Sequence, residues 1–251
     1  MAVVEKTIDI IGDEAFSNLI VSKTIPNGLP VDLYDDTVAS FRSYALYRHT
    51  QIQSLNFPKV TSCATSAMQG CSSLKRVEME NCTSMSERAL QDCPALESLY
   101  LPKLRGTGLC FLSVNGDDGT FPLTELNLPE LSMLGELALN GRTSLTSIIV
   151  PKLKTVYNYG FSGCMKMKQI DLPSVESLGA YVFNNCGQLE EVNVGPNIRT
   201  INANMLKNAR AGLVINFPFE EGEISGAPWG GIDVVINYGV EYSGDVPIPE
   251  D

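Results

Sequence analysis

Hydrophobic and polar positions recur along most of the chain with a period of about 22 residues. The clearest copy ends with Phe161, then Cys164, then a run in which apolar and polar residues alternate up to Pro173. The closing slot of successive units holds Pro58, Glu80, Pro102, Pro129, Pro151, Pro173, Pro196 and Pro218. Adjacent slots are 22 residues apart, except for one interval of 27 and one of 23. These eight units predict a solenoid, because residues at a fixed period pack on their equivalents in neighbouring turns.

The interior of the solenoid is predicted from columns that stay apolar from unit to unit. One column, about seventeen residues before the slot, holds Phe41, Cys63, Met85, Leu134, Val156, Leu178 and Ile201. The end of each unit alternates with period two, as in Ile170-Asp171-Leu172, which is typical of a strand. The proline then ends the strand, since it has no N–H to donate. We therefore expect an α/β, β-rich solenoid of about eight repeats with one long parallel sheet.

Three regions follow from this period. Residues 1–36 fit it poorly and are predicted to cap the N-terminal end, or alternatively to dock to another protein. Residues 37–218 form the solenoid, with an insertion at about 106–121 that is either a contact loop or a tolerated surface loop. Residues 219–251 form a C-terminal cap and tail. In this cap we expect Trp229 to lie over the last turn and residues 232–238 to add a strand, and we expect the tail from Ser243 to Asp251 to be mobile.

The formal net charge of −11 argues against nucleic acid as a partner, because nucleic acid requires clustered Lys and Arg. The same charge argues against an anionic membrane surface. No stretch is long and apolar enough to span a membrane, so we expect no membrane insertion. The first residues carry acidic side chains where a signal peptide needs an unbroken apolar run.

Seven cysteines invite a metal or redox hypothesis. A further column, nine residues before the slot, holds His49, Cys71, Cys93, Arg142, Cys164, Cys186 and Ala209. Stacked turns place such thiols on a line, whereas zinc needs four ligands that converge. We expect these cysteines to form a buried and reduced packing ladder, without disulfides, metal or cofactor. Cys110 does not belong to this column, and its position is not predicted.

No pattern of catalytic residues is present. His49, the only histidine, has no nucleophile or carboxylate patterned beside it, and no nucleophile elbow, phosphate loop or zinc-protease motif occurs. The protein is therefore not expected to be an enzyme.

The candidate site is the outward face of the sheet, where each strand presents the residue between its two inward ones. Most of these residues are polar, and the proposed binding set is Tyr100, Asn127, Ile149, Asp171 and Asn193. Tyr100 and Ile149 are the nonpolar exceptions, and the insertion emerges between them. They form either a protein-contact patch or an ordinary scatter of apolar surface residues.

The core from Phe161 to Pro173, F-x-x-C with a closing I-x-L-P, resembles the BspA-type leucine-rich repeat. The resemblance covers about residues 37–218 and implies a right-handed leucine-rich-repeat superhelix that serves as a binding scaffold. Similar repeats occur in surface and secreted proteins of anaerobic and gut-dwelling bacteria and in some of their phages. Members are described as adhesins that bind host matrix proteins or other cells.

The resemblance implies two alternative functions. The first is a monomeric binding module for a protein or glycan partner in adhesion, at the cell surface or secreted if a leader is removed. The second is a structural or assembly component of a larger particle, such as a phage tail-associated protein. Without a leader, the expected location is cytoplasmic or phage-associated.

Overall fold

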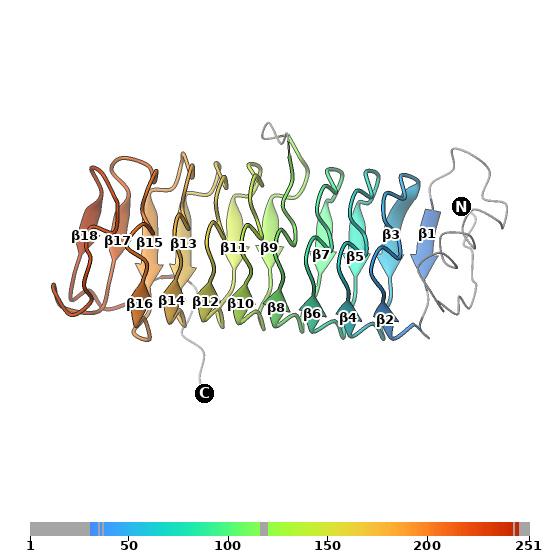
Figure 1. Ribbon diagram of the computed structural model, residues 1–251, viewed down its shortest axis with the longest axis horizontal. Coiled ribbons are helices and arrows are strands. Elements are labelled where there is room, and N and C mark those ends of the chain that lie inside the picture. The colour runs from blue at the N-terminus through green and yellow to red at the C-terminus, as the bar shows by residue number, and fades with distance from the viewer. Residues whose placement is uncertain (1–30, 35, 37, 116–119, 243, 246–251) are drawn as a thin grey trace.

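The computed structural model describes residues 31–245, apart from 35, 37, 116–119 and 243. These residues form a straight stack of turns with two parallel rows of strands (Figure 1). The first row contains β1 (Val31–Tyr34), β3 (Ile52–Asn56), β5 (Arg76–Glu78), β7 (Ser98–Tyr100), β9 (Glu125–Asn127), β11 (Ser147–Ile149), β13 (Gln169–Leu172), β15 (Glu191–Val194), β17 (Val214–Asn216) and β18 (Val235–Asn237). The second contains β2 (Ser40–Phe41), β4 (Ser62–Cys63), β6 (Ser84–Met85), β8 (Gly106–Thr107), β10 (Met133–Leu134), β12 (Thr155–Val156), β14 (Ser177–Leu178) and β16 (Thr200–Ile201).

The expectation of one long sheet is wrong. Short strands of the second row form a continuous eight-stranded sheet, whereas the first row is divided into β1-β3-β5-β7, β9-β11 and β13-β15-β17-β18. The first division falls at the five-residue insertion, which lengthens the chain between β7 and β9 and removes the regular register there. All pairs are parallel, and partners are usually one repeat apart, such as Ser54 with Arg76.

The α/β label is also wrong for the described residues, which contain no helix. Two positions in most turns have positive φ, for example Tyr44 at 61° and Arg48 at 57°. A left-handed residue interrupts a right-handed helix within one turn. The N–H groups of this segment bond alternately to the next turn, as Leu46 does to Ala67 O at 2.6 Å, and to the residue three before, as Ala45 does to Arg42 O at 3.2 Å.

The core follows the predicted columns. Their members from Phe41 to Leu178 are buried, and Ile201 at the end is half-buried. In the insertion turn Thr107 fills the column that begins at Phe41, and Leu104 is buried beside it, so the interior continues through this turn. Rings stack between turns, as Phe161 does on Phe183 with centroids 6.1 Å apart. Each buried side chain of this size contributes about 1.5–3 kcal/mol, so the stack is held chiefly by contacts between neighbouring turns.

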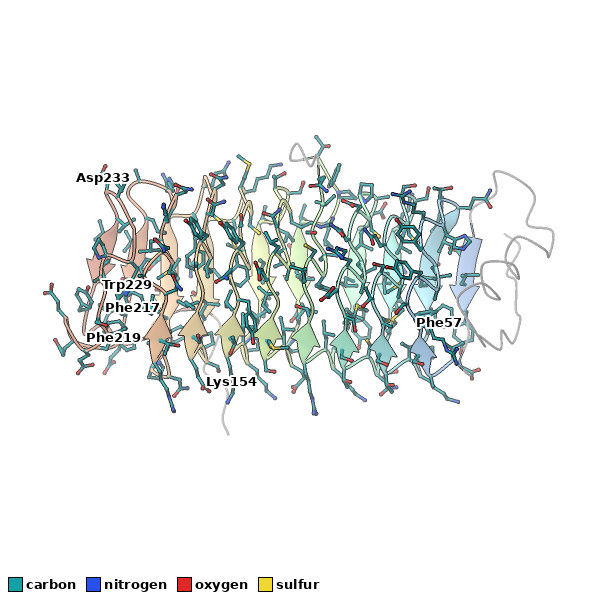
Figure 2. The ribbon with its side chains drawn as sticks, in the orientation of Figure 1. Phe57, Lys154, Phe217, Phe219, Trp229 and Asp233 are labelled. Atoms are coloured by element: carbon teal, nitrogen blue, oxygen red, sulfur yellow. The ribbon has the colours of Figure 1, made fainter. Side chains whose placement is uncertain are left out.

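Both ends extend beyond the predicted eight repeats, since the first row has ten strands. At the N-terminal end, β1 pairs in parallel with β3 although residues 31–34 fall in the segment predicted as a cap; residues 1–30 lie outside the described part. At the C-terminal end, β18 pairs with β17 as predicted. Trp229 is fully buried with its ring centroid 5.3 Å from that of Phe217, at the end of the stack (Figure 2).

Candidate functional site

The outward face of the first row, here called the strand face, is built by strict register. Strand pairing aligns one residue of each turn in a column: Tyr34, Asn56, Glu78 and Tyr100 in the first sheet, Asn127 and Ile149 in the second, and Asp171, Asn193, Asn216 and Asn237 in the third. Tyr34 and Asn237 were not predicted to belong to this column, because both lie outside the regular period. Alternation in Val31-Asp32-Leu33-Tyr34 was the available signal for the first of them.

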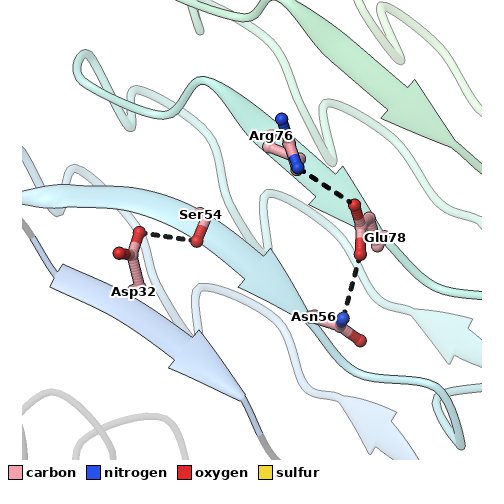
Figure 3. Close-up of polar contacts among 5 residues, drawn as sticks. All are labelled: Asp32, Ser54, Asn56, Arg76 and Glu78. Atoms are coloured by element: carbon pink, nitrogen blue, oxygen red, sulfur yellow. Dashed lines mark hydrogen bonds and ion pairs between the residues drawn. The ribbon is translucent and has the colours of Figure 1, made fainter. Parts of the chain in front are cut away.

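The N-terminal part of the strand face is a set of mutually bonded polar side chains (Figure 3). Ser54 Oγ donates to Asp32 Oδ1 at 2.6 Å, and Asn56 Nδ2 donates to Glu78 Oε2 at 2.9 Å. Arg76 Nη1 lies 3.6 Å from Glu78 Oε1. These contacts hold the side chains of this part in fixed positions, and it presents charged and polar groups rather than apolar area.

Tyr100, Asn127 and Ile149, which we call the central patch, differ from both neighbouring parts. Tyr100 is 55% exposed and Ile149 is 41% exposed, and Asn127 is also exposed. Within the described part of the chain, the side chains of Tyr100 and Asn127 make no hydrogen bond to other residues. The central patch therefore offers apolar area together with a phenol and an amide that face water.

The two other predicted binding residues are not accessible. Asp171 is 6% exposed and Asn193 is 3% exposed, so their assignment to an open surface is wrong. One reason is an amide ladder: Asn193 Nδ2 donates to Asp171 Oδ1 at 2.9 Å, and Asn216 Nδ2 donates to Asn193 Oδ1 at 2.8 Å. Asn237 Nδ2 continues the ladder to Asn216 Oδ1 at 2.8 Å. We call Asp171, Asn193, Asn216 and Asn237 the amide ladder.

The cysteine column is a packing ladder, as predicted, and all seven cysteines are free. Four thiols each donate to a carbonyl of the preceding turn, Cys71 to Leu46 at 3.0 Å and Cys186 to Phe161 at 3.1 Å among them. Burial raises the pKa of both Cys93 and Cys186 to about 12, and that of Cys71 further. These thiols are protonated at neutral pH and are poor nucleophiles or metal ligands.

Arg142 takes the place of a cysteine in this column and is 1% exposed. Its Nε donates to Leu112 O at 2.7 Å, and its Nη2 lies 3.4 Å from Cys93 O, one turn further. The guanidinium thus spans the insertion turn, whose chain leaves the regular path. Cys110, which lies outside the predicted columns, is half-buried with φ of 54° at the same left-handed position as Tyr44.

The described residues offer little support for a metal site, a charged histidine or a membrane-spanning helix. They contain no group of three or more histidine, cysteine or acidic side chains placed to hold a metal ion. Burial lowers the pKa of His49, which leaves it neutral at pH 7. No helix able to cross a membrane occurs in the described ranges.

Comparison with known proteins agrees with this geometry. The sequence profile of the "BspA type Leucine rich repeat region" matches residues 2–107 and 118–225, with six copies. A leucine-rich repeat protein of T. pallidum has the same fold with a TM-score of 0.52 and 21% identity, over 65% of this chain and 74% of that one. One from Bacteroides ovatus ATCC 8483 gives 0.54 and 18%, over 85% of this chain and 70% of that one. No curated protein matches the sequence.

Proposed function

Because the chain belongs to the family of proteins with BspA-type leucine-rich repeats, we propose that it is a non-enzymatic binding scaffold that holds a partner on its strand face. Repeat solenoids of this kind present a long surface whose variable positions are free to recognise a ligand. The observation that carries the proposal is the central patch, where Tyr100 and Ile149 are exposed between a charged and polar part and the amide ladder.

The chemistry of the central patch favours a protein partner over a glycan. Ile149 is a branched aliphatic side chain that gains chiefly from burial against other apolar groups. Tyr100 combines a large apolar ring with a hydroxyl, the combination enriched at the centres of protein interfaces. Asn127 lies between them and supplies donors and acceptors on the same surface.

A binding panel tests the proposal. The wild-type chain and the Tyr100→Ser/Ile149→Ser variant are immobilised and exposed to purified extracellular-matrix proteins and to a glycan array. Tyr157→Ser is the matched control, because Tyr157 is 47% exposed but follows β12 in the second row. We expect a protein of the panel to bind the wild type and the control, and to bind the double variant at least tenfold more weakly, since loss of about 1.4 kcal/mol is tenfold.

Two results would count against the proposal. Binding only to glycans would assign the strand face to a different class of partner. Binding of the double variant with unchanged affinity would move the interface away from the central patch. Circular dichroism of both variants checks that the fold is intact.

A further inference from the structure

Asp171 and Asn193 are buried at positions whose column faces outward. Their equivalent Tyr100 is 55% exposed, whereas Asp171 is 6% exposed. The amide ladder alone does not explain this, because Asn216 and Asn237 belong to it and stay partly exposed. Pro173, at the end of β13, is also buried, while the equivalent Pro151 is not. Something other than the ladder therefore covers the face at β13 and β15.

That cover is the chain's own C-terminal segment. After β18 the chain turns back, and Val240 N donates to Phe217 O at 3.0 Å. Further on, Gly244 lies against Asp171: a Cβ on Gly244 would be only 2.6 Å from Asp171 Oδ1 and 2.5 Å from Tyr242 Oη. The segment has thus crossed from the edge of the sheet at β18 to β13.

The contact brings a phenol and two carboxylates together. Removal from water raises the pKa of Tyr242, and the charges of Asp171 and Asp245 raise it further. Asp171 also accepts from Gln169 Nε2 at 3.0 Å and from Asn193 Nδ2 at 2.9 Å, so its own strand and β15 hold the carboxylate that the tail meets. Asp245 adds a like charge close by, which opposes seating. The fit is therefore close in shape, and the charge of Asp245 is the part of it that opposes seating.

We propose that the strand face over β13 and β15 is a seat for an extended peptide segment, and that the chain's own Val240–Tyr242, Gly244 and Asp245 occupy it as a displaceable intramolecular competitor. The seat borders the central patch, and the idea of an external competitor rests on the proposed function. A competing peptide with a cation in place of Asp245 would exchange a like charge near Asp171 for an opposite one. Such a partner would contact the outward-facing residues of the strand face from Tyr100 to Asn216.

Carboxyl footprinting on the full chain tests whether the tail covers the seat. Carbodiimide labelling followed by mass spectrometry compares Asp171 with Glu78, its less buried equivalent on β5. In the wild type we expect Asp171 to react about tenfold more slowly, as a buried group does. In Tyr242→Ala/Gly244→Leu the new side chain overlaps Asp171, and the rate should approach that of Glu78. Gly187→Ala is the control, because no atom lies within 4 Å of its added Cβ.

A peptide of residues 241–251, labelled with fluorescein, tests whether the seat recognises a segment in trans. We expect saturable binding to the Tyr242→Ala/Gly244→Leu chain and at least tenfold weaker binding to the wild type, whose tethered tail competes at high effective concentration. An Asp245→Lys peptide should bind more tightly than the native peptide, most clearly at low salt. A scrambled peptide of the same composition should not bind.

Each outcome decides the proposal. Fast labelling of Asp171 in the wild type, or slow labelling in the double variant, shows that the tail does not cover it. Equal peptide binding to both chains, or none to the double variant, shows that no peptide seat exists. If the double variant does not fold, the wild-type footprint and the single Tyr242→Ala variant still decide. None of these measurements uses the partner of the central patch, so either proposal can fail while the other stands.

Discussion

At the scale of single residues, the cysteine column shows how one position serves the stack without reacting. Cys71, Cys93, Cys164 and Cys186 each fill a small space and donate to a carbonyl of the preceding turn. Arg142 makes the same contact through Nε where the insertion distorts the neighbouring turn. Cysteine and arginine can therefore occupy the same column, because both donate a hydrogen bond to the carbonyl at the equivalent position of the preceding turn.

The thiols should be protected until the chain unfolds. With excess Ellman's reagent at pH 8 we expect about one fast thiol, the half-buried Cys110, and six slow ones that react with the rate of global opening. Cys110→Ser should remove the fast phase and leave the slow one. Several fast thiols that persist in this variant would contradict a closed interior.

The raised pKa values predict a loss of stability in alkali. Cys93 and Cys186 ionise at about 12 in the fold and at about 8.5 in the unfolded chain, so above about pH 8.5 the native state binds more protons than the unfolded state. Their contribution is complete below that pH and falls between it and about 12, by about 1.4 kcal/mol per thiol and pH unit. Urea titrations at pH 7.5 and 9.5 measure it. A Cys93→Ala/Cys186→Ala variant should show a shallower decline.

Loss of the Arg142 side chain should destabilise the insertion turn. Arg142→Ala leaves a cavity and removes donors to two buried carbonyls, so we expect about 2–5 kcal/mol less free energy of unfolding by urea denaturation. Arg142→Lys should recover only part, because an ammonium cannot reproduce the fork. Arg199→Ala, at an exposed site, should stay within about 0.5 kcal/mol. An equal effect of the two alanine variants would contradict the bridging role.

At the scale of elements, the strands and the turns differ in how far sequence could predict them. The strands of the first row followed from alternation and from the closing proline, as in Ile170-Asp171-Leu172. The segment after each short strand was not predictable as turns, because positive φ at Tyr44 or Tyr159 leaves no mark when the residue is not glycine. Burial of Asp171 was equally hidden, since it depends on a contact with Gly244 far along the chain.

The C-terminal cap is an element whose removal should loosen the end of the stack. Trp229 packs on Phe217 and Phe219, its Nε1 donates to Ser225 O at 3.1 Å, and its carbonyl accepts from Leu206 N at 2.9 Å. Trp229→Ala should cost about 3–5 kcal/mol. Hydrogen exchange should rise first at β17 and β18, while protection at β5 is unchanged. A uniform rise across all turns would show that the cap is not a separate unit.

At the scale of the whole molecule, the parallel pairing of strands aligns residues one sequence period apart on a common surface. The stack holds one residue of each turn in a line, and the identity of that residue divides the strand face into a polar part, the central patch and the amide ladder. The sequence predicted this line and the exposed Tyr100 and Ile149. It did not predict that the other residues of the line bond to their neighbours or, like Asp171, are covered by the tail. Those contacts depend on distances between turns.

The most direct measurement of the central claim is site-specific photo-crosslinking to the protein identified in the binding panel. Tyr100 is replaced by p-benzoylphenylalanine in one chain and Tyr157 in another, since both tyrosines are exposed and Tyr157 directly follows β12 in the other row of strands. Binding through the central patch predicts a crosslinked complex from position 100 and none from position 157. A complex formed equally from both positions, or only from position 157, would contradict it.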